Sequence, residues 1–147
     1  MEITPAGRVR QLAPLVGRWR TFGTVFGEDG APVMSVDGTD EYEWMPGGQW
    51  VIHRVDVAMG NDRARALELI GEPADDGTFA MRAFDSSGSF DEMRLTVHGR
   101  TMLAEGDRVR NTLTAADTGR SMTATWERQT DGGAWIRWMD LTFQRIR

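Results

Sequence analysis

One histidine is the residue of this sequence best placed to do chemistry. His53 lies in the segment Trp50–Met59, which alternates apolar and polar residues as a half-buried strand does. Side chains along a strand point to opposite faces in turn, so His53 shares a face with Val51 and Val57 and is predicted to point inward. An imidazole there could shuttle protons, hold a ligand or bind a metal, and it could equally be a core histidine bonded to a neighbouring acid.

Acidic residues on the predicted strands are candidate partners for this histidine. They are Glu41, Glu43, Asp56, Glu68, Glu92, Glu127 and Asp140. Glu68 and Asp140 alternate with apolar residues and are predicted to point inward, whereas Asp56 lies on the outer face of its strand. A histidine–carboxylate pair orients the ring and raises its basicity, so His53 and Glu68 are candidate catalytic residues, with Asp56 a second choice. The alternative is that these acids pair with arginines on the outside.

Aromatic residues indicate a pocket. Six tryptophans are present, five of them in two predicted hairpins, and each indole buries a large apolar area while offering one N–H donor. Aromatic walls with a few polar groups are typical of small-molecule sites, although large side chains can also simply fill a core. The predicted pocket-lining residues are Tyr42, Trp44, His53, Glu68, Trp126, Trp138 and Asp140.

Several classes of protein are excluded or disfavoured. The chain has no cysteine and two histidines, so no metal site is predicted, and no nucleotide-binding glycine loop or G-x-S-x-G motif points to a cofactor or a serine nucleophile. The net charge is -5 with scattered basic residues, which argues against nucleic acid. No apolar run approaches the roughly 20 residues of a membrane helix, and no signal region is visible, so a cytoplasmic location without membrane contact is expected.

The elements that would hold these residues are mostly strands. A short N-terminal helix is predicted with Thr4 as its cap, Pro5 at its first position, and Pro14 and Gly17 limiting its length. Its apolar side would be Val9, Leu12, Ala13 and Val16, and it could act as a lid or plug at one end of the fold. Predicted strands cover Trp19–Phe26, Ser35–Met45, Trp50–Met59, Ala64–Ile70, Phe79–Phe84, Phe90–Val97, Thr101–Glu105, Arg108–Ala115, Ser121–Gln129 and Trp135–Ile146.

Short turns rich in glycine and aspartate separate these strands, as in an up-and-down antiparallel meander. Closing such a meander into a barrel removes its exposed edges. We therefore predict an all-β fold: one antiparallel barrel of about ten strands with a short N-terminal helix, forming a single domain over residues 1–147. A barrel of this size is wide enough to enclose a small ligand.

The motifs together resemble a known family. L-x-G-x-W at Leu15–Trp19, E-W-M-P-G-G at Glu43–Gly48, H-R-V-D at His53–Asp56, L-E-L-I-G at Leu67–Gly71 and W-x-x-W-M-D at Trp135–Asp140 are similar to the lipocalin-like domain of unknown function 1579 family. The resemblance covers nearly the whole chain. It implies a calycin-type barrel similar to fatty-acid-binding proteins and haem-binding nitrobindins, and it implies no activity.

The resulting functional hypothesis is binding of a small, largely apolar or amphipathic molecule inside the barrel. The alternative is a cofactor-independent isomerase, cyclase or hydratase that uses His53 with a carboxylate as acid and base. Haem is a third reading that the residues disfavour, because nitrobindin-like barrels hold iron through a histidine near the C-terminus and the segment Trp135–Ile146 contains none. No cofactor is therefore expected, and a homodimer is possible.

Overall fold

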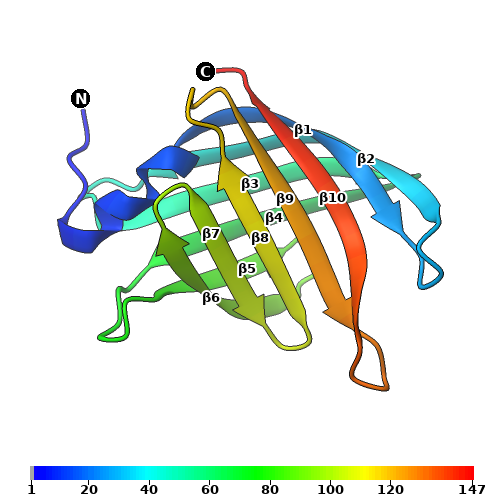
Figure 1. Ribbon diagram of the computed structural model, residues 1–147. Helices are drawn as coiled ribbons and strands as arrows, with labels where there is room; N and C mark the ends of the chain where they lie inside the picture. The colour runs from blue at the N-terminus through cyan, green and yellow to red at the C-terminus, as the bar shows by residue number, and fades with distance from the viewer. Residues whose placement is uncertain (1) are drawn as a thin grey trace.

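Ten antiparallel strands form a closed barrel in the computed structural model, which describes residues 2–147 (Figure 1). The strands are β1 (Gly17–Phe26), β2 (Pro32–Trp44), β3 (Trp50–Met59), β4 (Asp62–Gly71), β5 (Phe79–Asp85), β6 (Phe90–His98), β7 (Thr101–Gly106), β8 (Val109–Ala115), β9 (Ser121–Gln129) and β10 (Trp135–Arg145). Each strand pairs with the next in sequence, and β1 pairs with β10. The predicted all-β barrel is confirmed, and each predicted strand matches an observed one to within a few residues.

The inward face of β3 is the one that the alternation predicts. Val51, His53 and Val57 are buried, while Arg54 is exposed on the opposite face. The register places Tyr42 of β2 opposite His53, and His53 opposite Glu68 of β4. Directly opposed residues project from the same face of a sheet, so the three side chains meet inside the barrel.

The N-terminal helix differs from its prediction. It is a 3-10 helix, η1 (Gly7–Leu15), and the residue before it is Ala6, which makes no side-chain cap, so the predicted cap at Thr4 and start at Pro5 are wrong. Val9, Leu12 and Leu15 are its buried residues, one in every three, because a 3-10 helix has three residues per turn. An α-helical spacing would have buried Ala13, which is exposed.

This helix covers one end of the barrel. Figure 1 shows η1 (dark blue) at the end where the turn between β2 and β3 lies, and the amide of Ala6 donates a 2.8 Å hydrogen bond to the carbonyl of Gly48 in that turn. Its buried side chains join a core cluster that includes Trp19, whose indole N–H donates to the carbonyl of Leu15 at 2.9 Å. Among residues 2–147, no helix has the length and apolarity that crossing a membrane demands.

Glycine lets neighbouring strands approach closely on the inner wall. A Cβ atom at Gly38 of β2 would collide with the backbone of Asp56 and Val57 in β3. A Cβ atom at Gly23 of β1 would likewise collide with the backbone of Asp140 in β10. Glycine inside a strand commonly marks such a close approach, which allows the tight curvature of a closed barrel.

We expect Gly38→Ala to destabilise the barrel by about 1–3 kcal/mol, because the added methyl group forces two packed backbones apart. Urea unfolding followed by tryptophan fluorescence measures the change. Gly132→Ala is the matched control, since a Cβ atom there meets only one side-chain oxygen at 3.9 Å. Equal unfolding midpoints for the two variants would refute the role of Gly38.

Candidate functional site

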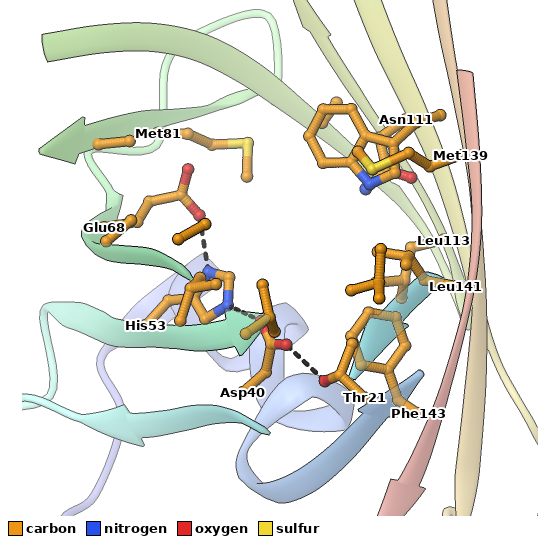
Figure 2. A pocket seen from close by; sticks show the side chains of 18 of the residues that line it. Thr21, Asp40, His53, Glu68, Met81, Asn111, Leu113, Met139, Leu141 and Phe143 are labelled. Carbon is orange, nitrogen blue, oxygen red and sulfur yellow. Dashed lines mark hydrogen bonds and ion pairs between the residues drawn. The ribbon is translucent and has the colours of Figure 1, made fainter. Parts of the chain in front are cut away.

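Four polar side chains form one hydrogen-bonded chain across the inner wall of strands β1 to β4 (Figure 2). The Thr21 hydroxyl donates to Asp40 Oδ1 at 2.5 Å. Asp40 Oδ2 lies 2.6 Å from His53 Nε2, and His53 Nδ1 lies 3.0 Å from Glu68 Oε1. We call these four residues the polar wall.

Strand register explains how the polar wall assembles. Asp40 lies two residues before Tyr42 in β2, so it shares the inward face and reaches His53 diagonally. Thr21 of β1 lies opposite Gly38 of β2, which carries no side chain. Asp40 lies two residues beyond Gly38 on the same face of β2, so the Thr21 hydroxyl reaches it diagonally.

Both carboxylates bond to the His53 ring, and this contact sets its protonation. A carboxylate accepts hydrogen bonds only, so each ring nitrogen must carry a hydrogen and the ring is an imidazolium. Burial alone lowers the pKa of His53, but hydrogen bonds to Asp40 and Glu68 and the charges of these two groups raise it from 6.5 to about 9. The side chains of His53, Asp40 and Glu68 are only 11%, 8% and 12% exposed, so water screens their interaction poorly.

Tyr42 packs flat against the imidazolium. The two ring centroids lie 3.9 Å apart with an interplanar angle of 9°, a geometry that brings the phenol face against a cation. Burial raises the pKa of Tyr42 well above 10, and the charges of Asp40 and Glu68 raise it further. The phenol therefore stays neutral beside the polar wall.

A cavity of about 240 Å³ lies beside the polar wall, far above the roughly 10–15 Å³ that one water needs. All ten strands contribute to its lining, which is mostly apolar. Figure 2 shows His53 and Glu68 facing Leu113, Met139 and Leu141 across the open space. Small side chains such as Ala66 of β4 leave much of that space empty.

Four of the seven predicted pocket residues line this cavity, namely Tyr42, His53, Glu68 and Trp126. Three lie outside its lining. Trp44 packs against the core cluster at the helix end, and Trp138 meets Trp126 edge-on with ring centroids 5.8 Å apart. Asp140 forms an ion pair with Arg137.

The misplacement of Asp140 has a structural cause. Its strand β10 carries a register irregularity between Arg137 and Met139, and the opposite face, with Met139 and Leu141, lines the cavity. Asp56, the second-choice acid, is on the outside as its parity indicates, where its carboxylate accepts from Arg63 Nε at 2.8 Å.

Sequence reasoning missed three polar residues of the cavity: Thr21, Asp40 and Asn111. Asp40 has the same parity as Tyr42, and that signal could have revealed it. Asn111 of β8 alternates with Val109 and Leu113, a mixed pattern that singles out no polar residue. Among residues 2–147, no donor bonds to the buried Asn111 Oδ1.

The polar wall leaves one polar atom free for chemistry. His53 has no unpaired nitrogen and its ring is already protonated, so it can act as a base only after it loses a proton. Within the described residues, no donor bonds to Glu68 Oε2, and Figure 2 shows this second oxygen directed away from His53. Glu68 rather than His53 is therefore the group that can accept a hydrogen bond or a proton from a bound molecule.

Haem does not fit this arrangement. Both nitrogens of His53 bond to carboxylates, so neither is available to ligate iron. His98, at the end of β6, is exposed and lies outside the cavity lining. Residues 2–147 contain no group of three or more His, Cys, Asp or Glu residues placed to hold a metal ion.

Comparison with known proteins identifies the family. A family model described as protein of unknown function (DUF1579) matches residues 4–145. The chain belongs to this family. The predicted DUF1579 membership is thereby confirmed, and no curated protein matches the chain.

A solved structure supports the fold of this DUF1579 protein. The crystal structure of Rv2717c from M. tuberculosis is similar with a TM-score of 0.72 and 13% identity, over 98% of this chain and 100% of that one. At that identity the likeness shows a shared fold and nothing about activity. A protein of unknown function from the DUF3598 family of Nostoc punctiforme has 8% identity and a TM-score of 0.29, over 96% of this chain and 100% of that one.

The buried imidazolium makes stability depend on pH. The pKa of His53 is about 9 in the folded protein and 6.5 without the folded surroundings, as in the unfolded chain. The stability that the protonated ring contributes is therefore complete below pH 6.5 and is lost as the pH rises to 9. We expect the free energy of unfolding to fall by about 3 kcal/mol across this window, as the pKa difference implies. Urea unfolding between pH 6 and 9.5 measures the fall.

Two variants control this experiment. His53→Gln cannot be protonated and should lose the pH dependence, whereas His98→Gln alters an exposed histidine and should keep it. A wild-type protein equally stable at pH 6.5 and pH 9 would contradict the imidazolium.

Proposed function

We propose that the barrel binds a small, largely apolar molecule in its cavity. The observation that carries this proposal is the cavity itself: about 240 Å³, lined by all ten strands, mostly apolar, with the polar wall on one side. Ligand sites typically combine an apolar lining with a few polar groups that fix orientation. A barrel with only a structural role would gain dispersion contacts by filling this space with larger side chains.

Apolar burial would supply the affinity and the polar wall the orientation. Each Å² of apolar surface removed from water contributes roughly 25 cal/mol, so a ligand that covers the lining gains several kcal/mol. Methionines on four strands, Met59, Met81, Met93 and Met139, are flexible and can adapt to its shape.

Acid–base catalysis is a second candidate, favoured by one observation. Glu68 carries a free carboxylate oxygen beside a buried imidazolium and faces the cavity. In this version Glu68 takes a proton from the bound molecule and His53 holds Glu68 in place. The role that the sequence suggested for His53 as the base passes to its neighbour.

The cytoplasmic location, the homodimer, and the absence of nucleic-acid and membrane partners stay predictions, because a single chain does not test them.

Filling the cavity should abolish binding. Ala66 lines the cavity, so Ala66→Phe should place an aromatic ring in the ligand's space. Ala58 has outward parity on β3 and is outside the lining, so Ala58→Phe is the matched control. Native mass spectrometry of each protein, purified from its own host, measures any bound molecule.

We expect a bound mass in the wild type and in Ala58→Phe, and none in a folded Ala66→Phe. A wild type without bound mass, or a folded Ala66→Phe that retains it, would contradict the proposal. Two bound masses that differ by a chemical conversion would favour the enzyme.

A further inference from the structure

We propose that the ligand carries a protonated amine, held by the free oxygen of Glu68. This inference rests on the proposed function and names the chemical class of the molecule that the cavity takes. The amine would approach the side of Glu68 that His53 leaves open, and the apolar body of the ligand would lie against the methionines and leucines opposite (Figure 2).

The charge of the cavity is the first argument. Its ionisable lining residues are Asp40, His53, Glu68 and the neutral Tyr42. Two ionised carboxylates and one imidazolium leave one negative charge in a poorly solvated space. An unpaired buried charge is costly, so a cationic ligand gains more here than a neutral one, and an anion is repelled.

No protein cation is placed to supply the missing charge. The sequence contains no lysine, and no arginine lines the cavity among residues 2–147. The arginines near this part of the barrel pair with acids elsewhere: Arg54 with Glu43, and Arg63 with Asp56. The compensating charge must therefore come from a bound molecule.

Unfilled acceptors are the second argument. Thr21 and His53 occupy both oxygens of Asp40, and His53 occupies one oxygen of Glu68, so Glu68 Oε2 remains. On another wall, Asn111 Oδ1 is buried in the cavity lining without a partner in residues 2–147. An ammonium group has three donors and no acceptor, which suits a site with acceptors left to fill.

Three probes of similar size and different charge test the proposal: 2-phenylethylamine, 2-phenylethanol and phenylacetate. Isothermal titration calorimetry at pH 7 measures their affinities for the wild type. We expect the amine to bind at least about tenfold more tightly than the alcohol, because hydrogen bonds between charged groups are stronger than those of a neutral hydroxyl, and we expect phenylacetate to bind most weakly. This comparison needs no variant.

Glu68→Gln removes the free charge and keeps the size of the side chain. It should reduce the preference for amine over alcohol to within about threefold. Glu43→Gln makes the same change on the outer face of β2 and should keep the wild-type preference. Thermal unfolding establishes that each variant is folded, and if Glu68→Gln is not, the wild-type comparison alone decides.

The outcomes separate the two proposals. Equal affinities for amine and alcohol, or a preference for phenylacetate, overturn the amine while leaving small-molecule binding intact. An amine preference that survives in a folded Glu68→Gln overturns the assignment to Glu68. Failure of all three probes to bind overturns the amine at this size, and the cavity-filling variant then decides separately whether the cavity binds anything.

Discussion

The contact of one imidazolium with two carboxylates governs the interior of this barrel. His53 is buried between Asp40 and Glu68, and none of the three charges is well solvated. Removing one partner of a buried ion pair typically costs about 3–5 kcal/mol, because the other charge stays buried and uncompensated. The contact also specifies register: slipping β3 by one residue would turn His53 outward and leave both acids facing an apolar space.

The cavity follows from the same constraint. The four side chains of the polar wall bond to one another and so do not extend across the barrel. Alanines on the adjoining strands are too small to fill the space that remains. Gly38 contributes to the same wall by bringing β2 and β3 close together, at a position where a Cβ atom would collide with the backbone of Asp56 and Val57. The result is a mostly apolar chamber with one polar wall, in which Glu68 Oε2 and Asn111 Oδ1 have no donor among residues 2–147.

Sequence patterns predicted the barrel well because strands with a two-residue period and short glycine turns leave few alternatives. Parity placed His53 correctly, since its strand is regular from end to end. The same argument failed for Asp140. Its strand β10 has a register irregularity, and the face of this strand that points inward is the opposite of the predicted one. Asp40 was missed because a local pattern does not show which polar residue meets another across strands, and Asn111 because the mixed pattern of its strand singles out no polar residue. The pairing of His53 with both acids is a property of register, and only the folded chain shows it.

The helix η1 makes the two ends of the barrel different. A closed ring of strands has no seam in its wall, so exchange with solvent must take place through an end, and η1 with its three buried side chains obstructs one of them. His53 is the fourth residue of β3 from that obstructed end, so the charged groups lie in the half of the barrel nearer to η1. A ligand would therefore enter through the opposite end of the barrel with its polar group first, and it would leave with its apolar part first.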